Sequence, residues 1–65
     1  MRYFLLDVKS DSLDELAYAS ANTKLNNRVY AVEDERLVEF EKKANEMGTP
    51  MMAISASSAL NIMAY

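Results

Sequence analysis

The segment from Asp34 to Pro50 constrains the fold most, because it carries a helical pattern with a marked beginning and a marked end. Asp34 is a favourable N-cap, and Glu35 suits the first turn, where the helix dipole stabilises an anion. Gly48 can adopt the left-handed conformation that ends many helices, and Pro50 prevents continuation. Val38 widens an apolar stripe whose members recur every three or four positions. These members are Leu37, Phe40, Ala44 and Met47. The pattern predicts an amphipathic helix that ends at Gly48.

Three other segments have the residue pattern of β-strands. Arg2–Lys9 alternates in polarity, which places Phe4 and Leu6 together on one side of a strand. Arg28–Glu33 is rich in β-branched and aromatic residues, and Met51–Ala56 is the third predicted strand.

A first helix is predicted between the first two strands. Ser12 and Glu15 match a capping box, in which each side chain accepts a hydrogen bond from an otherwise unpaired amide. We therefore expect a helix that begins at Leu13 and ends near Asn22, followed by a loop through Asn27.

The C-terminal segment fits two structures. Residues 57–65 can alternate as a fourth strand with Leu60, Ile62 and Ala64 inward, or Ser57 can cap a helical turn that buries Leu60, Met63 and Ala64. We favour the strand. Residues 47–65 contain no charge, but Gly-Thr-Pro and several serines within them favour a buried element over a membrane-spanning helix.

The elements follow one another in the order β-α-β-α-β, with a further strand if the tail is extended. This order predicts one α/β or α+β domain over residues 1–65, a single three- to four-stranded sheet with two helices packed on one face.

The composition excludes most classes of catalytic and binding site. Without histidine or cysteine, the chain lacks the commonest general base, any thiolate nucleophile and the usual zinc ligands. Its single glycine excludes glycine-rich phosphate loops, and a net charge of −3 opposes nucleic-acid binding. We predict a protein that is not an enzyme and binds no cofactor, nucleic acid or membrane, and whose lack of cysteine suits the cytoplasm.

A group of acidic residues near the first helix is the best candidate for a metal site, because hard cations prefer carboxylate oxygens. The group consists of Asp7, Asp11, Asp14 and Glu15. Its spacing matches no calcium-binding loop, and helix capping together with the helix dipole explains the acids more simply. We therefore expect no metal.

One sheet face is predicted to be apolar and uncovered. If the helices cover Phe4, Leu6, Val29, Ala31, Met52 and Ile54, the opposite face shows Tyr3, Leu5, Tyr30, Val32, Met51 and Ala53. That face is too apolar for water, unless the C-terminal segment folds back over it. A chain of 65 residues also buries only a small core, so contact with another chain would add to its stability. We therefore predict association, including homo-oligomers, through a face made of Tyr3, Leu5, Tyr30, Val32 and Met51.

The net charge lies on one helix. Residues 33–46 hold six acids and three bases, whereas the rest of the chain balances four acids against four bases. An ordinary solvated helix explains such a face, but it can also steer the domain toward a basic partner. We predict that Glu35, Glu39 and Glu46 contact this partner.

Three functional hypotheses follow. The first is a non-enzymatic protein-interaction module, a small acidic inhibitor or regulator of the kind that phages and mobile elements encode, which binds a larger protein. The second is a structural subunit that assembles into a homo-oligomer through sheet edges or the apolar face. The third is an enzyme in which Asp7, Asp11 and Asp14 hold a metal.

Overall fold

The computed structural model of the chain describes residues 1–8 and 10–63. Over these residues it has a four-stranded sheet, three α-helices and one 3-10 turn. The elements in chain order are β1 (Arg2–Leu6), α1 (Asp11–Leu16), β2 (Ala19–Asn22), β3 (Arg28–Val32), η1 (Asp34–Arg36), α2 (Leu37–Glu46), β4 (Met52–Ile54) and α3 (Ala56–Met63). The α+β class with one small sheet is therefore confirmed.

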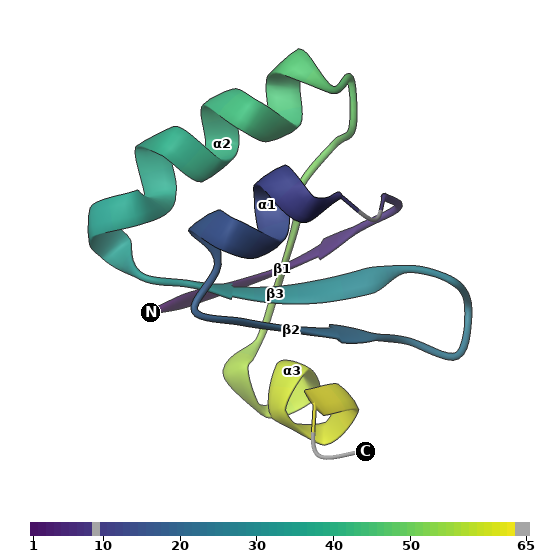
Figure 1. Cartoon of the computed structure of the whole chain (residues 1–65). Coiled ribbons are helices and arrows are strands. Elements are labelled where there is room, and N and C mark those ends of the chain that lie inside the picture. Colours follow the sequence, from purple (N-terminus) through teal and green to yellow (C-terminus); the bar gives the residue numbers. More distant parts are fainter. Residues whose placement is uncertain (9, 64–65) are drawn as a thin grey trace.

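The sheet is antiparallel throughout, with the strand order β2-β3-β1-β4. Helices α1 and α2 lie side by side on one face, as predicted, and α3 lies on the other (Figure 1). The sheet is thus covered by helices on both faces.

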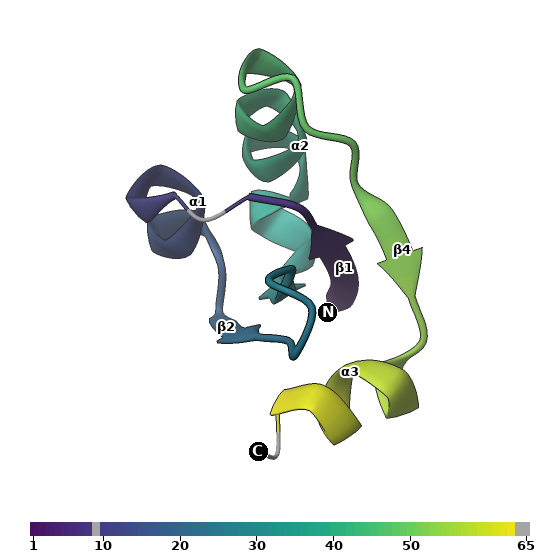
Figure 2. The same ribbon diagram turned by 90° about the vertical axis from the view of Figure 1, so that its right-hand side faces the viewer.

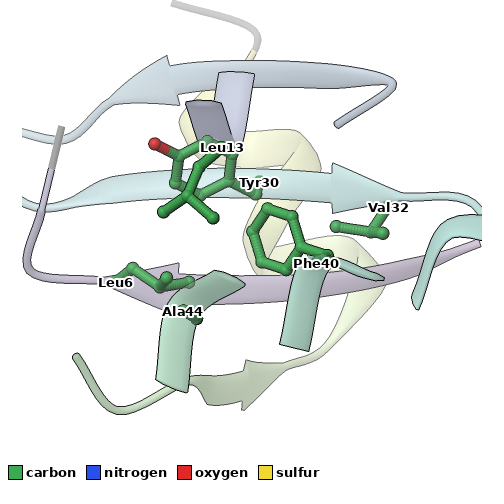
Figure 3. Packing of buried hydrophobic residues seen from close by; sticks show 6 residues of the cluster. All are labelled: Leu6, Leu13, Tyr30, Val32, Phe40 and Ala44. Atoms are coloured by element: carbon green, nitrogen blue, oxygen red, sulfur yellow. The ribbon is translucent and has the colours of Figure 1, made fainter. Parts of the chain in front are cut away.

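The main core lies between the sheet and the helix pair α1 and α2. Its buried members are Leu6, Leu13, Tyr30, Val32, Phe40 and Ala44 (Figure 3). The ring of Phe40 packs against two aromatic rings of the sheet, with centroid distances of 6.3 Å to Phe4 and 5.2 Å to Tyr30. Aromatic contacts of this kind contribute about 1 kcal/mol each beyond simple burial. They attach the apolar stripe of α2 to β1 and β3.

The predicted end of the second helix is confirmed in detail. Gly48 has φ +69°, the left-handed conformation expected of it. Its N–H donates to the carbonyl of Asn45 at 3.0 Å, and the N–H of Thr49 donates to the carbonyl of Ala44 at 3.1 Å. This pair of bonds is the Schellman motif, which satisfies carbonyls that a helix end would otherwise leave unpaired.

The predicted first helix is too long and begins too late. Helix α1 ends at Leu16, and Ala19–Asn22 forms β2, an edge strand that pairs with β3. Ser10 is the N-cap instead of Ser12, because its Oγ accepts from the Ser12 N–H at 3.3 Å. Pairing with the free edge of β3 outweighs the low strand propensity of the alanines in β2. Tertiary structure therefore decides this segment.

The favoured strand at the C-terminus is wrong, and the alternative helix is correct. Helix α3 begins one residue after Ser55, whose Oγ accepts from the Ser58 N–H at 3.2 Å, so Ser55 rather than Ser57 is the cap. Ala59 is its buried residue, Leu60 is 56% exposed and Met63 is half-buried. The predictions for Ala64 concern a residue outside the described part of the chain.

The predicted grouping of residues on the two sheet faces is also wrong. Residues directly opposite each other in an antiparallel pair share a face, and Phe4 lies opposite Tyr30. Tyr30 and Val32 therefore lie with Phe4 and Leu6 beneath α1 and α2. Val29 and Ala31 lie with Tyr3 and Leu5 on the face that α3 covers. Both faces can carry apolar residues because helices shield both from water.

Candidate functional site

The predicted apolar interaction face does not exist as one open surface. Tyr30 and Val32 are fully buried in the main core, and Met51 is half-buried against that core. Tyr3 and Leu5 are half-buried on the opposite face, where α3 packs. The five residues are thus divided between two covered faces, and the correction follows from the strand register and from α3.

The three acidic residues predicted to bind a partner are all exposed. Glu35 belongs to η1, whereas Glu39 and Glu46 lie near the two ends of α2. Glu39 and Glu46 share a groove of about 380 Å³ with the Glu15 side chain of α1. The full lining of this groove is Ser12, Glu15, Leu16, Glu39, Lys42, Lys43 and Glu46. The structure therefore brings two of the three predicted acids together and leaves Glu35 apart from the groove.

Most carboxylates of this acidic region are available to a partner. Lys43 Nζ lies 3.8 Å from Glu46 Oε2, and the N-terminal amine lies 3.6 Å from Asp34 Oδ1. Over residues 1–8 and 10–63, no ion pair involves Glu35, Glu39 or Glu41. Because exposed ion pairs contribute little, even the paired carboxylates can exchange partners. Lys42 stands four residues after Val38 and Lys43 four residues after Glu39, so the region is an exposed surface of both signs with a net negative charge.

Val38 is an apolar side chain in the middle of this surface. It is 79% exposed and stands three residues from both Glu35 and Glu41. The sequence pattern assigned it to the buried stripe, but Val38 lies two positions from Phe40, about 200° around the helix. With Phe40 directed at the sheet, Val38 faces away from it. We call Glu35, Val38, Glu39 and Glu41 the acidic face.

The 3-10 turn that carries Glu35 is tied to the end of α1. Arg36 Nη1 donates to the backbone carbonyl of Glu15 at 3.4 Å. The base nearest to Glu35 in the sequence is therefore directed toward α1. This contact ties η1 to the last turn of α1.

A cluster of half-buried polar side chains, Asp14, Ser20 and Arg28, joins α1 to strands β2 and β3. Arg28 Nε lies 3.9 Å from Asp14 Oδ1, and Arg28 Nη1 donates to Ser20 Oγ at 3.1 Å. Both Asp14 Oδ1 and Arg28 Nε, like the Tyr30 hydroxyl, are buried with no hydrogen-bond partner among the described residues. Burial, reinforced by the Asp14 carboxylate, raises the pKa of Tyr30 to about 12. Tyr30 thus keeps its proton at neutral pH.

The acids considered for a metal site do not assemble into one. Asp7 and Asp11 are exposed, and Asp14 is directed toward Arg28. Within residues 1–8 and 10–63, no group of three acidic side chains could hold a metal ion. Among the same residues, no helix has the length and apolar character needed to cross a membrane.

Comparisons with protein families, curated proteins and solved structures give no match for this chain. Its candidate function therefore follows from the exposed acidic face and the groove beside it.

Proposed function

We propose that the protein is a non-enzymatic interaction module, a small acidic inhibitor or regulator that binds a larger protein with a basic surface. The observation that supports this proposal is the acidic face, where Val38 is 79% exposed among carboxylates that make no ion pair within residues 1–8 and 10–63. A mobile-element or phage regulator is the kind of protein that this size and charge would suit.

The carboxylates and Val38 have different roles in this proposal. Glu35, Glu39 and Glu41 attract a basic partner over several ångströms, which raises the rate of association and makes it sensitive to salt. Val38 supplies apolar area that only a docked partner can cover. Complete burial of a valine side chain stabilises a complex by about 1.5 to 3 kcal/mol. The carboxylates thus determine which partner binds, and burial of Val38 stabilises the complex.

The groove beside α2 extends the proposed contact surface. It carries both signs of charge, because Lys42 and Lys43 lie among Glu15, Glu39 and Glu46. A partner that places a basic side chain against Glu39 must therefore avoid the two lysines. This mixed pattern favours one orientation of the partner over others, since like charges brought together are costly.

A site-specific cross-linking experiment tests the proposal. A photo-reactive amino acid at position 38 is compared with the same group at Leu25, which is 81% exposed on the β2–β3 hairpin. We expect a protein of the native host to be cross-linked from position 38 and not from position 25. That protein is then purified and its affinity is measured with the variant Glu35→Gln/Glu39→Gln/Glu41→Gln.

The expected result is weaker binding of the triple variant, with unchanged far-UV circular dichroism. The proposal fails if cross-links form only from position 25, or if the triple variant binds the purified partner as tightly as the original chain does.

A further inference from the structure

Strand β4 forms an open edge of the sheet. It pairs on one side with β1, and Figure 2 shows no other described element beyond its outer side. Met52 is 61% exposed, and Ala53 is exposed as well. An edge strand carries unpaired N–H and C=O groups that can bind a further strand.

This edge lacks the charges that usually protect edge strands. Natural proteins commonly place lysine or another charged side chain on an exposed edge, because a charge prevents pairing with a second chain. No charged residue occurs from Met47 to the end of the chain. Pro50 and the start of α3 limit β4 to three residues, but they leave Met52, Ala53 and Ile54 unprotected.

From this edge we infer that a second copy of the chain binds through β4 and forms a continuous antiparallel sheet across the two copies. A twofold axis between two β4 strands makes their pairing antiparallel, which is the arrangement of every other pair in this sheet. The inference goes beyond the proposed function and does not depend on it.

The distribution of charge favours a second copy over a basic partner at this edge. The net charge of −3 lies on residues 33–46, so two copies that met through α2 would oppose like charges. At β4 they meet through a strand without charged side chains, beside a hollow where Arg2 and the N-terminal amine offset Asp34. A basic protein, by contrast, gains no attraction from a strand without charged side chains.

Side chains around β4 can extend the contact beyond backbone pairing. A stable interface buries about 800 Å² on each partner, whereas three paired residues alone bury much less. Met1, which is 49% exposed and lines a hollow together with Ala53 and Ile54, adds apolar area next to the strand. A hollow of about 320 Å³ beside the strand is lined by Leu5, Leu6, Asp7, Asn27, Pro50, Met51 and Met52. Flexible methionines of the second copy can fill such an irregular hollow.

Analytical ultracentrifugation of charge variants tests the inference. Ala53→Glu and Ala53→Lys each place like charges across the twofold axis, so each variant alone should lose the dimer that the original chain forms. An equimolar mixture of the two variants should regain a dimer, because opposite charges then face each other. Ala19→Glu, the same change at an exposed alanine of the other edge strand β2, is the matched control and should leave the dimer intact.

Circular dichroism establishes that all the variants are folded. A monomeric original chain at millimolar concentration overturns the inference. So does a dimer that is lost in Ala19→Glu and kept in Ala53→Glu, which would place the contact at β2. None of these outcomes alters the cross-linking test of the acidic face, so the two proposals fail separately.

Discussion

The ring of Tyr30 on β3 lies 5.2 Å from the ring of Phe40 on α2, tilted by 60°. Both side chains are fully buried. This contact joins the central part of the sheet to the helix that carries the acidic face. The orientation of α2, and hence the outward position of Val38, depends on it.

The first prediction concerns Tyr30 and alkaline pH. Burial raises the pKa of Tyr30 from 10.0 to about 12 in the folded protein. Below pH 10 both the folded and the unfolded chain keep this proton, so the contribution of Tyr30 to stability is constant there. Between pH 10 and pH 12 the unfolded chain loses the proton first, and the free energy of unfolding falls by on the order of 2 kcal/mol.

Urea unfolding at several pH values measures this effect. Tyr30→Phe is the control, because it keeps the ring and removes the titrating hydroxyl. At neutral pH this variant should unfold within about 1 kcal/mol of the original chain, since the hydroxyl it removes makes no hydrogen bond within residues 1–8 and 10–63. Equal losses of stability between pH 10 and pH 12 in both proteins would show that Tyr30 is not responsible.

The second prediction concerns the cap of α3. Ser55→Ala removes the acceptor for the Ser58 N–H and should lower the free energy of unfolding by about 1 kcal/mol. Ser57→Ala is the matched control, because Ser57 is exposed and its side chain caps nothing among the described residues. Thermal unfolding compares the two variants, and equal effects would contradict the assignment of Ser55 as the cap.

How much of this fold the sequence predicts depends on whether local or distant contacts decide each segment. The end of helix α2 is predictable because Gly48 is a local signal, but its predicted start is wrong, since Asp34 lies within η1 instead of capping the helix. The segment Ala19–Asn22 is not predictable, because its alanines become a strand only when β3 offers a free edge. The sequence of the C-terminal segment is ambiguous for a similar reason. The spacing of its apolar residues fits both a strand and a helix until the sheet face beneath α3 is known.

In the candidate site, too, local sequence predicts some features and distant contacts decide others. The exposure of Glu35, Glu39 and Glu46 follows from their charge, and the sequence predicts it. The position of Tyr30 depends on its register against Phe4, which alternation within a single strand cannot give. Likewise the exposure of Val38 depends on the direction in which the stripe of α2 faces, and only the packed structure fixes that direction.

A third prediction concerns the end of α2. Gly48 has φ +69°, and a Cβ built at this position meets no atom within 4 Å. Gly48→Ala should therefore cost only backbone strain, about 1 to 2 kcal/mol in the free energy of unfolding. Gly48→Asn should cost less, because asparagine tolerates the left-handed region better than alanine does. Chemical unfolding of both variants measures the order, and an alanine variant as stable as the original chain would contradict it.

The central claim is that an acidic face on α2 draws a basic protein partner to this domain. The most direct measurement is the association rate, by stopped flow at increasing salt, of the purified cross-linked partner with the original chain and with Glu35→Gln/Glu39→Gln/Glu41→Gln. The account predicts a rate for the original chain that falls steeply with salt, and a slower rate for the variant with a weaker salt dependence. Equal rates and equal salt dependence for the two proteins would contradict it.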